Sequence, residues 1–204
     1  MNFANQLTVL RMMFIPFFIL AMLTGRMAWA LALFLVAGLT DAVDGLIARL
    51  YRQKTDLGAF LDPLADKLLL TAAFIVLTMP DSPSLFPEFI LVNRIPVRLT
   101  ILTISRDVLI VLIALVLNLV SEQRRFPPTL LSKINTAVQV VTVLAVLTFN
   151  TLTLASELFL PICYWATLLT TVVSGFHYIY LTARNMTAEG PACIPADPPS
   201  RPAA

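Results

Sequence analysis

The chain has 204 residues, of which 58% are hydrophobic and 13% are charged, and its mean hydropathy is +0.86. Soluble domains are roughly 45 to 50% apolar and about 25% charged, so this composition excludes an ordinary soluble domain and predicts an integral membrane protein. The formal net charge of +2 is compatible with a surface of anionic lipid and distinguishes little else.

Apolar segments follow one another along almost the whole chain. A helix needs about 20 mainly apolar residues to cross the hydrocarbon core of a bilayer. Segments of suitable length occur at residues 6–24, 28–50, 59–80, 98–120, 128–149 and 156–182. We therefore predict an all-α fold, a polytopic membrane protein with six transmembrane helices.

The connections and the tail indicate how the chain is organised. Residues 80–96 contain four prolines and a short apolar patch, which predicts a loop lying on the membrane surface. Residues 1–184 are predicted to form one membrane-embedded domain, and the Pro- and Ala-rich residues 185–204 a disordered tail. Basic residues favour the connections on the side of the termini by six to three, which predicts cytoplasmic termini. The lack of an Arg- and Ser-rich leader favours a bacterial plasma membrane over an organellar one.

Four aspartates lie in two pairs within these apolar segments, Asp41 with Asp44 and Asp62 with Asp66. A carboxylate at membrane depth costs several kcal/mol unless it is compensated, so four of them indicate a shared cation. The members of each pair are three or four residues apart and therefore share one face of a helix. The short polar connection at 50–57 predicts an antiparallel hairpin, in which both pairs meet near the cytoplasmic end.

The chemistry of this group predicts a metal centre. Carboxylate oxygens suit Mg²⁺ or Mn²⁺ better than Zn²⁺, which favours His or Cys. Two such ions about 3.5 to 4 Å apart can hold a phosphate and stabilise displacement at phosphorus. Further positive charge for a phosphate is available from Arg49, Arg106 and Lys133, each in or at the edge of a predicted span.

The same residues carry a family resemblance. The sequence DAVDGLIAR, eight further residues and GAFLDPLAD resemble the signature DxxDGxxAR, eight residues, GxxxDxxxD of the CDP-alcohol phosphatidyltransferases. The resemblance implies a six-helix fold, usually dimeric, with an active site open to the cytoplasmic leaflet. It also implies a reaction in which an alcohol attacks the β-phosphorus of a CDP-linked lipid and CMP departs.

Site roles follow from this resemblance, position by position. Asp41, Asp44 and Asp62 would be the main metal ligands, and Asp66 would bind the second ion and act as the general base. The CDP-lipid would be bound by the remaining signature positions together with the first aspartate: Asp41, Gly45, Ala48, Arg49 and Gly58.

Segments outside the signature indicate which alcohol accepts the phosphatidyl group. NQLTVLRMMFIPFF resembles both phosphatidylglycerophosphate synthases and cardiolipin synthases, whereas TISRDVLIVLIALVL and PTLLSKINTAVQ resemble the eukaryotic-type cardiolipin synthases. Ala114 and Asn135 stand where phosphatidylglycerophosphate synthases tend to have a second arginine and a second lysine. We therefore expect transfer from CDP-diacylglycerol to phosphatidylglycerol, which gives cardiolipin, with glycerol 3-phosphate as the alternative acceptor.

For several polar residues the sequence allows two roles. Arg106 is expected to line the acceptor pocket, or else to form a buried ion pair with Asp107; Lys133 is expected to bind the acceptor, or else to extend to the membrane surface. Lys67 is expected to pair with a carboxylate or a lipid phosphate. Four polar residues are equally expected to form interhelical hydrogen bonds or to contact the substrate: Ser132, Asn135, Thr136 and Gln139.

Two other functional classes compete with an enzyme. Acidic residues within a membrane also mark cation pathways, so a Mg²⁺ or proton-coupled transporter is a distant alternative. The crowding of the acids at one end of one hairpin argues against a route across the bilayer. A scaffold without activity would leave a full set of metal ligands without a use.

Overall fold

The computed structural model describes residues 3–51, 56–81, 86–120 and 130–187, and it places side chains for 12–40, 67–81, 86–113, 130–181 and 184. This described part is all-helical, without strands, which confirms the predicted class. Its helices are α1 (Phe3–Leu23), α2 (Met27–Tyr51), α3 (Asp56–Thr78), α4 (Val97–Val120), α5 (Leu130–Thr151) and α6 (Phe159–Thr187). Each begins and ends within a few residues of a predicted span. The predicted tail lies outside the described residues from 188 onward.

Two helical stretches of the described part are long and apolar enough to cross a membrane, Leu130–Thr151 and Phe159–Leu181. Shorter apolar stretches occur at Met12–Leu23, Met27–Thr40 and Lys67–Thr78. These stretches indicate a membrane protein, and the crossing of the bilayer by all six helices remains a prediction.

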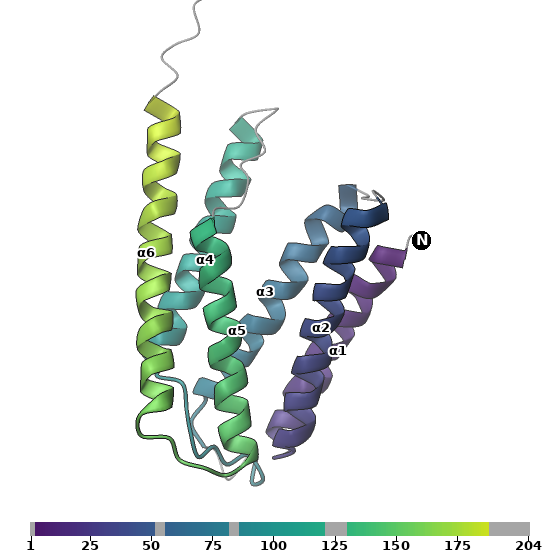
Figure 1. Ribbon diagram of the computed structural model, residues 1–204, viewed down its shortest axis with the longest axis vertical. Coiled ribbons are helices and arrows are strands. Elements are labelled where there is room, and N and C mark those ends of the chain that lie inside the picture. The colour runs from purple at the N-terminus through teal and green to yellow at the C-terminus, as the bar shows by residue number, and fades with distance from the viewer. Residues whose placement is uncertain (1–2, 52–55, 82–85, 121–129, 188–204) are drawn as a thin grey trace, which may run out of the picture.

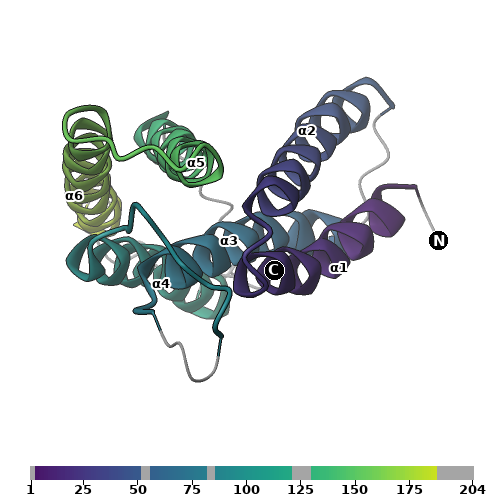
Figure 2. The same ribbon diagram turned by 90° about the horizontal axis from the view of Figure 1, so that it is seen from below.

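Successive helices run in opposite directions along one axis (Figure 1). The starts of α1, α3 and α5 and the ends of α2, α4 and α6 therefore lie together at what we call the upper end. Viewed along that axis, α2, α5 and α6 form one row above a second row of α1, α3 and α4 (Figure 2). Helix α3 packs against α1, α4 and α5, while α2 packs against α1 and α5, so α2 and α3 together join the first three helices to the last three.

The apolar core lies toward the lower end, between the two rows. Its largest fully buried side chains include Phe18 and Met22 of α1, Phe74 and Leu77 of α3, and Leu147 of α5. Burial of one such side chain contributes about 1.5 to 3 kcal/mol in water, so the core favours this arrangement of the lower halves.

The loop that follows α3 closes the lower end of the bundle. Phe89 and Leu91 are buried while Ile90 and Val92 are exposed, so alternate residues of the apolar patch face inward. The Ile95 amide donates a hydrogen bond of 3.1 Å to the Leu77 carbonyl. The predicted surface loop is thus in part a lid on the core, because its inward-facing side chains complete the apolar packing.

A pair of asparagines fastens this loop to α5. The Asn93 amide donates to Asn150 Oδ1 at 3.0 Å, and Asn150 Nδ2 donates to the Asn93 carbonyl at 2.9 Å. Asn93 Nδ2 also donates to the Leu154 carbonyl beyond α5. Backbone groups that would otherwise lack partners at the end of the bundle are thereby satisfied.

The interface of α4, α5 and α6 is polar rather than apolar. Buried residues on these helices include Arg106 of α4, Asn135 and Thr142 of α5, and Thr171 and Ser174 of α6. Thr142 and Thr167 share a hydrogen bond of 2.8 Å, and Thr171 donates to Asn135 Oδ1 at 3.0 Å. Such interhelical hydrogen bonds stabilise helix association in membranes by roughly 0.6 to 2 kcal/mol each.

Candidate functional site

All eight signature positions lie on helical backbone in the upper halves of α2 and α3. The first five, Asp41 to Arg49, occupy the final turns of α2, and the last three, Gly58 to Asp66, occupy the first turns of α3. The two helices are antiparallel and are separated in the chain by residues 52–55 only. The predicted hairpin is therefore present as backbone.

The side chains of the signature lie outside the described residues, and so does the geometry of the predicted metal centre. Its ligands (Asp41, Asp44, Asp62 and Asp66) and its lipid contacts (Gly45, Ala48, Arg49 and Gly58) remain predictions. Among the described side chains, no cluster of three or more His, Cys, Asp or Glu residues occurs.

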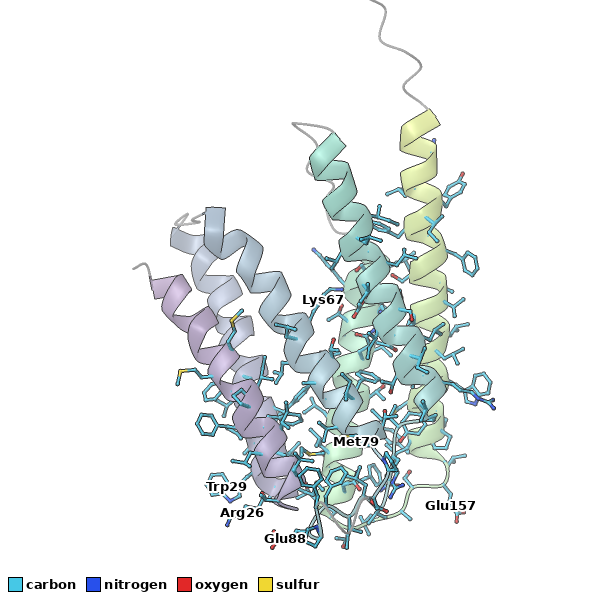
Figure 3. All side chains as sticks on the ribbon, turned by 180° about the vertical axis from the view of Figure 1, so that it is seen from behind. Arg26, Trp29, Lys67, Met79, Glu88 and Glu157 are labelled. Carbon is cyan, nitrogen blue, oxygen red and sulfur yellow. The ribbon has the colours of Figure 1, made fainter. Side chains whose placement is uncertain are left out.

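A charged network begins one residue beyond the signature, at Lys67 of α3. Lys67 Nζ lies 3.0 Å from Asp107 Oδ1 of α4, and Arg106 Nη1 lies 2.7 Å from the same oxygen. Figure 3 shows Lys67 extending from α3 on the side that faces α4. The expected pairing of Lys67 with a carboxylate is confirmed, and its partner is Asp107.

Arg106 joins three helices through its guanidinium group. Its Nη1 donates to Asp107, while its Nη2 donates to Ser132 Oγ of α5 at 3.1 Å and to Ser174 Oγ of α6. Arg106 is buried, and its Nε has no hydrogen-bond partner among the described residues. Arg106 therefore forms the buried ion pair with Asp107, and its expected place in the acceptor pocket stays a prediction.

The other polar candidates on α5 differ in their hydrogen-bond partners and in their exposure. Ser132 and Asn135 form the interhelical hydrogen bonds described above, whereas Thr136 donates to the Ser132 carbonyl of its own helix at 3.1 Å. Gln139 is buried, and its Nε2 has no partner within the described residues. Lys133 is exposed near the upper end of α5.

An apolar groove of about 280 Å³ lies beside the signature, between α2, α3 and α5. Its walls include Gly38 and Leu39 of α2, Leu69 of α3, and Thr136 and Val140 of α5. Leu39 precedes Asp41 by two residues, and Leu69 follows Asp66 by three. The groove therefore begins within one helical turn of the signature on both helices.

The arrangement of this hairpin agrees with a comparison of the whole sequence. The sequence model of the CDP-alcohol phosphatidyltransferases matches residues 1–175, which include all eight signature positions. The chain belongs to the CDP-alcohol phosphatidyltransferase family. The resemblance stated from the signature alone is thereby confirmed.

Individual relatives within the CDP-alcohol phosphatidyltransferases fall into two groups. The chain is 37% identical to a cardiolipin synthase (CMP-forming) of Rattus norvegicus over 167 residues, which cover 74% of this chain and 51% of that protein. It is 35% identical to the CDP-diacylglycerol–glycerol-3-phosphate 3-phosphatidyltransferase of Bacillus subtilis (strain 168) over 194 residues, which cover 87% of this chain and 93% of that one.

Another relative of the first group is the human cardiolipin synthase (CMP-forming), which is 36% identical over 74% of this chain. The chain spans about half the length of the rat and human cardiolipin synthases that it matches. Both acceptor classes expected from the sequence are therefore represented among the named relatives.

Three features of this candidate site were missed by sequence reasoning. Ser174 was not a candidate, although the adjacent pair Ser174 and Gly175 interrupts an otherwise bulky apolar helix. An ideal Cβ at Gly175 would lie 3.7 Å from Arg106 Cγ, so this glycine borders the arginine stem. The groove was also missed. Its sequence signal is Gly38: a Cβ added there would meet no neighbouring helix within 4 Å, so the glycine borders open space.

Proposed function

We propose that this chain transfers a phosphatidyl group from CDP-diacylglycerol to a glycerol-type acceptor and releases CMP. The observation that carries the proposal is the complete signature on the upper ends of two antiparallel helices, within a family match over residues 1–175. The names of the relatives support both the donor and the class of acceptor.

The donor set of the signature fits two divalent cations, Mg²⁺ or Mn²⁺. Four carboxylates need compensation by positive charge, and the adjacent cation Lys67 already has Asp107 of α4 as a partner. Asp41, Asp44, Asp62 and Asp66 would hold the ions through oxygen, as hard cations prefer. When bound, such ions withdraw charge from a diphosphate and stabilise the departing phosphate of CMP.

The roles of the protein groups follow from the chemistry of the transfer. The acceptor hydroxyl oxygen forms a bond to the β-phosphorus, the bond from that phosphorus to the CMP oxygen breaks, and the hydroxyl proton passes to Asp66. An alcohol is a weak nucleophile at neutral pH, so a positioned carboxylate base accelerates its attack, typically by 10² to 10⁴-fold. Gly45, Ala48 and Gly58 would leave room for the nucleotide, and Arg49 would contact its diphosphate.

The apolar groove supports a lipid as the donor substrate. Its walls are almost entirely aliphatic or aromatic, and it begins within a turn of the signature on α2 and α3. A fatty acyl chain in this groove would place the attached diphosphate beside the aspartates. Apolar burial of this kind contributes roughly 0.8 kcal/mol per methylene transferred from water.

The described charges near the acceptor side favour phosphatidylglycerol over glycerol 3-phosphate. Lys67, Arg106 and Asp107 together carry one net positive charge, which matches the single charge of a phosphodiester. A dianionic phosphate would be held better by several unpaired cations. Arg106, through its Nε–H, and the exposed Lys133 are the proposed acceptor contacts.

Two further properties belong to this proposal. We expect the chain to act as a homodimer in a lipid bilayer. We also expect the upper end to face the cytoplasm, because Arg49 and Arg184 lie at that end while Arg26, Arg94 and Arg98 lie toward the lower one.

The decisive experiment offers the purified protein CDP-diacylglycerol labelled in the cytidylate, in mixed micelles with Mg²⁺ or Mn²⁺. Phosphatidylglycerol and glycerol 3-phosphate are supplied separately, and the lipid product is identified by mass spectrometry. We expect labelled CMP to appear with cardiolipin in the first case. Failure to release CMP with any alcohol acceptor would refute the enzymatic proposal, since neither a transporter nor a scaffold produces it.

A further inference from the structure

The carboxylate of Asp107, on α4, pairs with a cation on α3 and with a second cation on its own helix. Its Oδ1 lies 3.0 Å from Lys67 Nζ of α3 and 2.7 Å from Arg106 Nη1 of its own helix. Asp107 is the one described acid that receives two cations on the same oxygen.

The two cations lie next to different parts of the proposed site. Lys67 follows Asp66 directly, so a restraint on Lys67 is a restraint on the turn of α3 that carries the proposed base. Arg106 extends the link to α5 and α6 through Ser132 and Ser174. The carboxylate therefore ties the middle of α3, directly after Asp66, to all three helices of the polar interface.

The effect of removing this charge follows from the burial of the two cations. Lys67 and Arg106 point at one oxygen, so without its charge they would repel each other at short range. The Arg106 side chain is only 5% exposed and is held between α4, α5 and α6, whereas the Lys67 side chain is 31% exposed and could carry its Nζ, which is buried here, outward by a change of rotamer. Loss of Asp107 would thus release Lys67 and leave Arg106 buried without a counter-ion.

We infer that Asp107 is a positioning residue for the acceptor, which holds Lys67 and Arg106 in place beside the acceptor phosphate. The inference rests on the proposed transfer reaction and deepens it. It concerns the acceptor rather than the CDP-lipid because the network lies on the α4 side of α3, whereas the apolar groove lies between α2, α3 and α5.

The test compares Asp107→Asn with Asp81→Asn in the purified full-length protein. Asp81 is a matched control, because its carboxylate also pairs with an arginine, Arg94, but belongs to the lower end. We expect Asp107→Asn to raise the KM for phosphatidylglycerol at least tenfold while the KM for CDP-diacylglycerol changes less than threefold. Asp107→Glu should restore the acceptor KM to within threefold of the original, and Asp81→Asn should change neither constant.

The outcomes separate the inference from the function on which it rests. If the unmodified protein releases no CMP, the proposed function fails and the inference fails with it. If the unmodified protein is active and Asp107→Asn either matches Asp81→Asn or raises both KM values equally, the positioning role alone is wrong. Should Asp107→Asn not fold, Lys67→Met replaces it, with a selective rise of at least fivefold in the acceptor KM as the supporting result and an unchanged KM as the contrary one.

Discussion

The burial of Arg106 predicts that it contributes far more to stability than a second, chemically matched arginine. Arg106 and Asp107 have side chains 5% and 14% exposed, whereas Arg94 and Asp81, which form the other pair, are 37% and 38% exposed. Removing one partner of a buried pair costs about 3 to 5 kcal/mol, and removing one of an exposed pair costs about 0 to 1 kcal/mol. Because Lys67 still pairs with Asp107, we expect the lower end of the first range, about 3 kcal/mol, for Arg106→Met.

The measurement is thermal unfolding of Arg106→Met and Arg94→Met in the same detergent, followed by circular dichroism. At about 2 to 4 °C per kcal/mol for a chain of this size, Arg106→Met should lower Tm by roughly 6 to 12 °C and Arg94→Met by less than about 4 °C. Methionine keeps an aliphatic stem beside Gly175, so the comparison reports charge and hydrogen bonding rather than a large cavity. Equal shifts for the two variants would refute the assignment of Arg106 to a buried network.

Other variants test the turn, the groove and the base. Gly25 has φ of +69°, and an added Cβ would press on the Glu88 carbonyl; Gly25→Ala should therefore cost at least about 1 to 2 kcal/mol in thermal unfolding, and Gly38→Ala, in open space, should cost nothing. An unchanged Tm for Gly25→Ala would contradict the close approach. Gly38→Phe should fill the groove and raise the KM for CDP-diacylglycerol at least fivefold without altering that for the acceptor; no rise would mean that the acyl chain binds elsewhere. Asp66→Asn should reduce turnover at least about 100-fold with the helical content intact, and chelation of divalent ions should abolish it. Near-normal turnover in either experiment argues against the proposed chemistry.

The helices and the family could be predicted because each depends on residues that lie close together in the sequence. Runs of about 20 apolar residues define the elements, and the eight signature residues occur within 26 consecutive positions, 41 to 66. Charge was also informative at Lys67, because a lysine within an apolar helix was expected to pair with a carboxylate or a lipid phosphate, and the structure shows a carboxylate.

The choice of partner could not be predicted, because it depends on how distant segments pack. Lys67 and Asp107 are separated by 40 positions, so no local sequence pattern links them. Ser174 gains its role only because α6 lies beside α4 at the level of Arg106. The inward alternation of Phe89 and Leu91 was likewise hidden, since the patch is too short to show which of its faces meets the core.

The asparagine pair at the base of the bundle also determines how the opposite end can move. Asn93 and Asn150 bind each other twice, and the Tyr164 hydroxyl donates to the carbonyl of the neighbouring Arg94, so the loop grips both α5 and α6 there. Helix α5 has 22 residues and acts as a lever about 33 Å long, so a swing of about 5° about this base displaces its far tip by roughly 3 Å. Near that tip Ser132 and Asn135 accept hydrogen bonds from Arg106 and Thr171, so a swing of this size would have to break or stretch those bonds.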